Sequence, residues 1–152
     1  MINLLKDSDS SPDISSISDI NIGEVKNYTL TYDIKTHESF GKYSGDYSKI
    51  HTDKKFAINN NFKDIIGYAF FLNSVFSQIY GMHFPGGTEL CLKSTSNYKK
   101  PFYINDILAF SLTVIGKNES LQTLTLNNTI KNQKKEIIYD GESILKLSLV
   151  NK

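Results

Sequence analysis

The segment 65–80 constrains the fold of this 152-residue chain more than any other stretch. It is long enough for a helix of about four turns, and its polar residues form one narrow stripe on a helical projection: Asn73, Ser74, Ser77 and Gln78. Every other face is apolar or aromatic. A helix that is apolar nearly all round is buried in the protein interior. We therefore expect a helix over residues 65–80, capped by Asp64 and ended at Gly81, with the rest of the chain wrapped around it.

The remainder of the chain supplies strands that can cover such a helix. Apolar residues alternate with polar ones, the pattern of half-buried strands, over residues 25–32, 88–98, 107–115, 121–130 and 137–150. Short turn-forming links at 116–118 and 132–134 make neighbouring strands antiparallel. Short helices are expected at 33–43 and after Asp53, which can cap the second of them. The sequence thus predicts an α+β protein with one antiparallel sheet around a central helix.

Composition narrows the class of protein. The length indicates one domain, which we place at residues 23–152 behind a flexible, Ser- and Asp-rich extension at 1–22. The net charge of +1, with 17 lysines as its basic residues, argues against a nucleic-acid binder. No apolar run reaches the roughly 20 residues of a membrane span, and the first residues lack a signal-peptide pattern. With the lone Cys91, these features favour a cytoplasmic protein without membrane association.

Asp46 and His51 are the candidate chemical pair. They lie five residues apart on a turn-rich segment just before the apolar helix. A carboxylate and an imidazole held together can share proton transfers. By residue type alone, however, the aspartate also suits a turn and the histidine a structural role. His37 has no ligand partner at metal spacing, so we expect it on the surface and expect no metal.

The surrounding residues resemble a family signature. Ser44-Gly45-Asp46-x-x-x-Ile50-His51-x-Asp53-x-x-Phe56-Ala57 is similar to the S-G-D-x-N-P-I-H-x-D-x-x-[YF]-A segment of the MaoC-like (R)-specific enoyl-CoA hydratases. The resemblance continues through Phe84-Pro85-Gly86 and residues 101–106 to residues 138–142, and so covers about residues 25–149. It implies a single hot-dog fold, in which an antiparallel sheet wraps a central helix.

The resemblance also implies a reaction, the syn addition of water to a trans-2-enoyl thioester to give an (R)-3-hydroxyacyl thioester, or its reverse. Asp46 and His51 would hold the water, and which of them is the base stays open. The other site positions implied are backbone N–H donors to the thioester at Gly67 and Ala69, Ser77 on the central helix, and acyl-tunnel walls at Phe70 and Phe84. The substrate would be carried by coenzyme A or the phosphopantetheine of an acyl carrier protein, with no further cofactor, and the chain would form a homodimer through a sheet edge.

The chain departs from the family pattern at the site itself. Ser48-Lys49 replaces the usual Asn-Pro, and Tyr68-Ala69 stands where the family has His-Gly. These changes keep two alternatives open beside the hydratase. One is a catalytically silent hot-dog protein that binds acyl groups or serves as a structural subunit, and the other is a hot-dog thioesterase.

Overall fold

The computed structural model describes residues 2–3, 11–87 and 89–147. Its elements are, in order, β1 (Ile2–Asn3), η1 (Ile17–Asp19), β2 (Val25–Thr31), α1 (Ile34–Ser44), α2 (Lys49–Thr52), α3 (Lys54–Asn59), α4 (Ala69–Gln78), η2 (Ile79–His83), β3 (Glu89–Ser94), β4 (Asn97–Tyr98), β5 (Ile107–Asn118), β6 (Thr123–Lys131) and β7 (Ile137–Leu147). The seven strands form one sheet in the order β1-β2-β5-β6-β7-β3, with β4 also paired to β7. The pairing is antiparallel except between β1 and β2. The predicted α+β class and the antiparallel sheet are confirmed.

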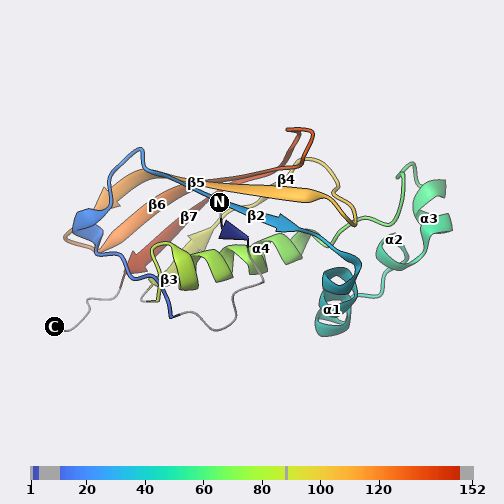
Figure 1. The fold of residues 1–152 in the computed structure, drawn as a ribbon, viewed down its shortest axis with the longest axis horizontal. Helices are drawn as coiled ribbons and strands as arrows, with labels where there is room; N and C mark the ends of the chain where they lie inside the picture. The colour runs from blue at the N-terminus through green and yellow to red at the C-terminus, as the bar shows by residue number, and fades with distance from the viewer. Residues whose placement is uncertain (1, 4–10, 88, 148–152) are drawn as a thin grey trace.

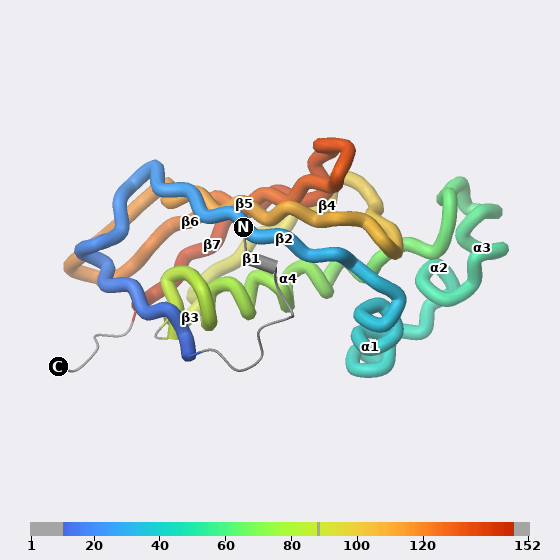
Figure 2. The backbone as a smooth tube through the Cα atoms, viewed as in Figure 1, coloured from blue at the N-terminus to red at the C-terminus, as the bar shows by residue number. Residues whose placement is uncertain are grey.

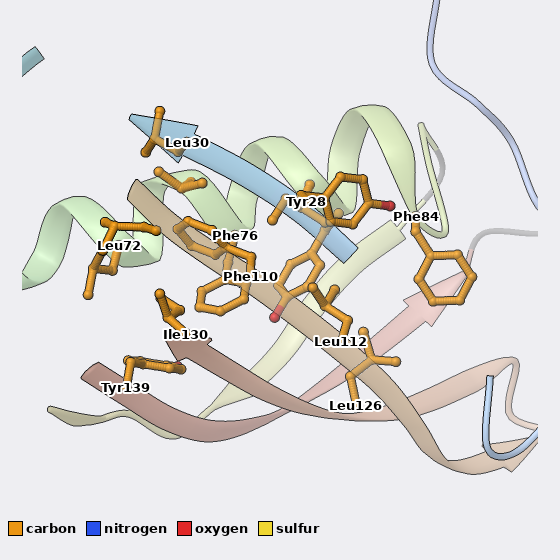
Figure 3. Packing of buried hydrophobic residues seen from close by; sticks show 14 of the residues in the cluster. Tyr28, Leu30, Leu72, Phe76, Phe84, Phe110, Leu112, Leu126, Ile130 and Tyr139 are labelled. Atoms are coloured by element: carbon orange, nitrogen blue, oxygen red, sulfur yellow. The ribbon is translucent and has the colours of Figure 1, made fainter. Parts of the chain in front are cut away.

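The helix α4 runs along one face of the sheet (Figure 1). Its buried residues are Phe71, Leu72, Val75 and Phe76. They meet the inward side chains of the strands in one core, seen from close by in Figure 3. The opposite face of α4 carries Phe70, Ser74 and Ser77, which are exposed. A single chain therefore covers only one side of the helix that the sequence predicted to be buried all round.

The helix begins four residues later than predicted. Residues 65–68 lie outside the helix, because Ile66 bridges to Tyr103 and the Gly67 N–H donates to the carbonyl of Phe102 over 2.7 Å. The Asp64 carboxylate accepts the neighbouring Ile65 N–H at 2.8 Å and the Lys54 ammonium at 2.7 Å, so it does not cap the first turn of α4. The start at residue 65 was wrong because pairing with a distant segment holds these residues out of the helix.

The predicted stop at Gly81 was also wrong. The chain continues from α4 into the π-helical turn η2, which contains Gly81 and ends at His83. The strand predictions held better, although β5 runs on to Asn118 through the residues expected to turn. Residues 148–150 of the predicted last strand lie outside the described residues.

The segment 11–22 is anchored to the core at two positions, although most of its residues are exposed. Ile17 and Ile20 are 5% and 2% exposed and belong to the core. The Asp13 N–H donates to the carbonyl of Met82 at 3.0 Å, which ties this segment to the end of η2, and the same approach is visible in Figure 2. The Lys117 ammonium donates to the carbonyls of Ile17 and Ile20 at 3.3 and 3.0 Å. The sequence did not indicate this packing, because isolated isoleucines in a polar stretch give no periodic signal.

Candidate active site

Three short helices, α1, α2 and α3, gather at one end of the sheet, beside the start of α4 (Figure 1). α1 ends at Ser44 and is capped by Gly45, whose φ of 72° lies in the left-handed region that favours glycine. Asp46 follows, and its Oδ1 accepts the N–H of Ser48 at 3.0 Å. The one-turn helix α2 then carries His51. The predicted pair thus lies on the turn and the short helix that follow α1.

The structure brings Asp46 and His51 together. Asp46 Oδ2 lies 3.7 Å from His51 Nε2, which is too long for a direct hydrogen bond. His51 Nδ1 lies 2.8 Å from the carbonyl oxygen of Ile66. Because a carbonyl only accepts, we assign the proton to Nδ1, which leaves Nε2 as an acceptor facing the carboxylate. Two acceptors at this separation can receive the two hydrogens of one water molecule.

The charge of Asp46 is fixed by its local hydrogen bonds. The hydrogen bond from the backbone N–H of Ser48 is the larger cause, and that with the Ser48 side chain the smaller, of a pKa for Asp46 below its usual value. The carboxylate is therefore ionised near neutral pH. Its side chain is 47% exposed, whereas that of His51 is 12% exposed, so the acid faces solvent and the imidazole is set into the protein.

His37 was predicted to lie on the surface, and this was wrong. It is 4% exposed, with Nδ1 3.0 Å from the Tyr32 hydroxyl and Nε2 2.9 Å from the carbonyl oxygen of His51. Burial lowers the pKa of His37, which favours the neutral ring that this arrangement requires. His37 and Gly41 lie one helical turn apart and are both buried on α1. This spacing marks the buried face of the helix, and the sequence analysis missed it.

Tyr68 also contacts both members of the pair. Its ring stacks on the His51 imidazole with centroids 4.1 Å apart and planes at 30°. Its hydroxyl donates to the Asp46 carbonyl at 2.9 Å. Sequence comparison marked Tyr68 only as a departure from the family pattern, because nothing in the sequence shows where its side chain lies.

Ala69 and Gly67, the two predicted backbone donors to the thioester, differ in whether their N–H groups are already hydrogen-bonded. Ala69 is the first residue of α4, and Tyr68 at the N-cap supplies no side-chain cap. The Phe71 N–H donates to the Tyr68 carbonyl at 3.1 Å, whereas the N–H of Ala69, at the first position, has no acceptor within the helix. Gly67 cannot serve in the same way, because its N–H already donates to Phe102. Beside them is a largely apolar cavity of about 240 Å³, whose lining includes Gly67, Ala69, Leu72, Phe102, Lys99 and Lys100.

Three further predicted residues do not reach the pair within one chain. Ser77 lies eight residues after Ala69 on α4, about 12 Å along the helix axis, and is exposed. Phe70 is 72% exposed. Phe84 is buried in the core after η2, beyond the other end of α4 (Figure 3).

Two known proteins are similar to this chain in sequence. The (R)-specific enoyl-CoA hydratase of Aeromonas caviae is 24% identical over 132 residues, which cover 87% of this chain and 98% of that protein. The 3-hydroxybutyryl-CoA dehydratase of Methylorubrum extorquens is 25% identical over 71% of this chain and 68% of that protein. No family model matches the chain.

Solved structures agree with these relatives. The Aeromonas caviae (R)-hydratase superposes with a TM-score of 0.80 and covers 86% of this chain and 98% of its own. The R-hydratase PhaJ1 of Pseudomonas aeruginosa superposes with a TM-score of 0.84 at 22% identity, over 91% of this chain and 88% of its own. The predicted resemblance is thereby confirmed. This chain has the hot-dog fold of the (R)-specific enoyl-CoA hydratases and MaoC-like dehydratases, and is similar to a curated member in sequence over most of its length.

Proposed function

We propose that this chain catalyses the reversible hydration of trans-2-enoyl thioesters to (R)-3-hydroxyacyl thioesters. The observation that carries the proposal is the geometry of Asp46 and His51, whose facing oxygen and nitrogen lie 3.7 Å apart. With His51 Nδ1 held by the Ile66 carbonyl, both facing atoms accept hydrogen bonds. A water that donates one hydrogen to each presents its oxygen lone pairs to the substrate.

The same arrangement accounts for the chemistry in both directions. As the water oxygen attacks C3 of the enoyl group and the C2–C3 π bond opens, one of the two acceptors takes a proton from the water. The same group, now protonated, delivers that proton to C2 from the same side and returns to its starting state. Addition of the oxygen to C3 and of the proton to C2 from one face gives syn addition. The two groups form a coupled pair, so the roles of base and acid belong to the pair in this proposal.

Negative charge that develops on the thioester oxygen needs a donor. The N–H of Ala69 is the best placed of the predicted donors, because it belongs to the first turn of α4, where the helix dipole favours negative charge. The adjacent apolar cavity suits part of the acyl or pantetheine chain. Lys99 and Lys100 on its lining carry positive charge, although they pair with Asp140 and Glu136 at 3.1 and 2.8 Å. Coenzyme A and acyl carrier protein present the same pantetheine arm, so both are candidate carriers.

A homodimer is part of the proposal. β3 ends the sheet and pairs only with β7 among the described residues, and its Leu90 and Leu92 are 61% and 52% exposed. An edge strand with exposed leucines favours association with another chain. The exposed face of α4, which carries Ser77, is also apolar at Phe70. A second copy that covers these surfaces is consistent with the dimeric arrangement expected from the sequence.

The test is hydration of crotonyl-CoA, followed by the loss of enoyl absorbance and by chiral analysis of the product. Asp46→Asn and His51→Ala should each lower kcat/KM by about 10²- to 10⁴-fold, the usual contribution of a general acid or base. Matched controls are Asp64→Asn, an exposed aspartate paired with Lys54, and His83→Ala, whose ring lies beside Tyr28. Both controls should retain the wild-type rate.

The outcomes separate the alternatives. Release of free thiol without hydration would identify a thioesterase. A folded protein that turns over neither crotonyl-CoA nor longer enoyl-CoA and enoyl carrier-protein substrates would contradict the hydratase and favour a silent acyl-binding protein. Wild-type activity in either Asp46→Asn or His51→Ala would refute the site.

A further inference from the structure

The turn that presents the catalytic pair has little rigidity of its own. Residues 44–49 are exposed and contain no proline. Within the turn, the described hydrogen bonds on Asp46 are local ones, from its N–H to the Ser44 hydroxyl at 3.3 Å and from the Ser48 N–H to its carboxylate at 3.0 Å. The distance between Asp46 and His51 must therefore be held by residues outside the turn.

Tyr68 supplies such a contact to each partner. Its hydroxyl donates to the backbone carbonyl of Asp46 at 2.9 Å, and its ring lies against the face of the His51 imidazole, 4.1 Å between centroids. The Tyr68 side chain is 3% exposed. Its hydroxyl is seated against Gly41, where an added Cβ would come 2.5 Å from the oxygen. The absence of a side chain at Gly41 thus leaves room for the hydroxyl that reaches Asp46.

A buried hydrogen-bonded chain holds the backbone of Tyr68 and that of His51. The Tyr68 N–H donates to the Tyr32 hydroxyl at 3.4 Å, and this hydroxyl lies 3.0 Å from His37 Nδ1. His37 Nε2 lies 2.9 Å from the His51 carbonyl. Since the carbonyl must accept, His37 Nε2 is the donor and His37 Nδ1 accepts from the Tyr32 hydroxyl. Each polar atom of this hydrogen-bonded series then has a partner. Tyr32 and His37 are 0% and 4% exposed, so this support lies in the protein interior.

We propose that Tyr68 is a positioning residue, whose hydroxyl fixes the backbone of Asp46 relative to the His51 ring. The inference rests on the proposed function for its kinetic consequence, but the geometry it describes is independent of turnover. Displacement of a reacting group by about 1 Å can lower a rate by about 10²-fold. Loss of the hydroxyl should therefore affect the chemical step more than substrate binding.

The kinetic test is Tyr68→Phe, which keeps the stacked ring and removes the hydroxyl. We expect kcat for crotonyl-CoA hydration to fall about tenfold or more with KM within about twofold of wild type. The control is Tyr43→Phe, because Tyr43 is 92% exposed, and it should leave both constants unchanged. A kcat for Tyr68→Phe within twofold of this control would overturn the proposal.

A second substitution distinguishes positioning from general destabilisation. Lys49→Pro stiffens the same turn from within, so it should restore at least a third of the lost kcat in the Tyr68→Phe background, measured per folded molecule. A tenfold loss that Lys49→Pro leaves unchanged would mean that the hydroxyl does not act through the turn, and would also overturn the proposal.

An NMR measurement keeps the inference testable if no substrate is turned over. With Asp46 Oδ2 3.7 Å from His51 Nε2, ionisation of Asp46 at acid pH should appear as an inflection in the His51 ring signals. Asp46→Asn should abolish it, and Tyr68→Phe should at least halve its amplitude. An unchanged amplitude in Tyr68→Phe would refute the positioning role, whereas a halved amplitude in a protein without hydratase activity would support it and refute only the proposed function.

Discussion

Replacement of Ile20 by alanine tests whether the N-terminal segment is part of the folded domain. Ile20 lies just after the short turn η1 and is 2% exposed, in contact with the core beside Ile17. Its carbonyl is held by the Lys117 ammonium at 3.0 Å. The substitution removes three buried carbons from a position that the backbone cannot readily leave.

The expected loss of stability follows from this burial. Three carbons at about 0.8 kcal/mol each give about 2.4 kcal/mol, and incomplete closure of the resulting cavity adds to this value. We therefore expect the free energy of unfolding to fall by about 3 kcal/mol. For a chain of this length, that corresponds to a decrease in Tm of about 6–12 °C.

The assay is urea unfolding followed by far-UV circular dichroism, with Ile22→Ala as the matched control. Ile22 is two residues away and 64% exposed, so its truncation should change stability by no more than about 0.5 kcal/mol. If Ile20→Ala and Ile22→Ala unfold at the same urea concentration, the segment is not docked in solution and the reasoning is refuted.

Three further outcomes are expected. Lys49→Pro alone should raise the free energy of unfolding by about 0.4–1 kcal/mol in the urea assay. The reason is that it places proline at the first position of α2, after Ser48, whose ψ is 144°. A clear decrease in the free energy of unfolding would show that the backbone there cannot accept proline. Hydrogen bonds from Ser48 depress the folded-state pKa of Asp46, so the carboxylate stabilises the fold above its unfolded pKa, and this contribution is lost as the pH falls through the folded pKa. By NMR, the titration midpoint of Asp46 should lie below the usual aspartate value in wild type. The midpoint should rise in Ser48→Pro, which removes the N–H, more than in Ser48→Ala, which keeps it. Leu92→Lys should convert a dimer into a monomer by light scattering at micromolar concentration, whereas Leu121→Lys, at a position 63% exposed, should not, and a wild-type monomer would contradict the dimer itself.

The parts of the fold that follow from local pattern were predictable. Alternation placed Tyr28 and Leu30 inward on β2, and both are buried. The cap predicted at Asp53 is present, with its carboxylate accepting the Phe56 N–H at 3.0 Å. Such features depend on neighbours within a few residues, which the sequence displays directly.

The features that the sequence did not disclose depend on distant partners. The start of α4 is set by the pairing of Ile66 with Tyr103, 37 positions further along the chain. The burial of His37 depends on the backbone of His51. In the site, the five-residue spacing predicted that Asp46 and His51 could meet, but no spacing rule shows that the Tyr68 ring lies against His51.

The docking of residues 11–22 has a consequence for synthesis of the chain. This segment leaves the ribosome early, yet its partners include Met82 and the Lys117 ammonium, which lies 100 positions beyond Ile17. Ile17 and Ile20 therefore stay exposed to water until β5 has been made, because contacts between distant residues cannot form before both exist. This segment, made before its partners, is thus among the last to reach its place, and during that interval its isoleucines are available to chaperones or to other nascent chains.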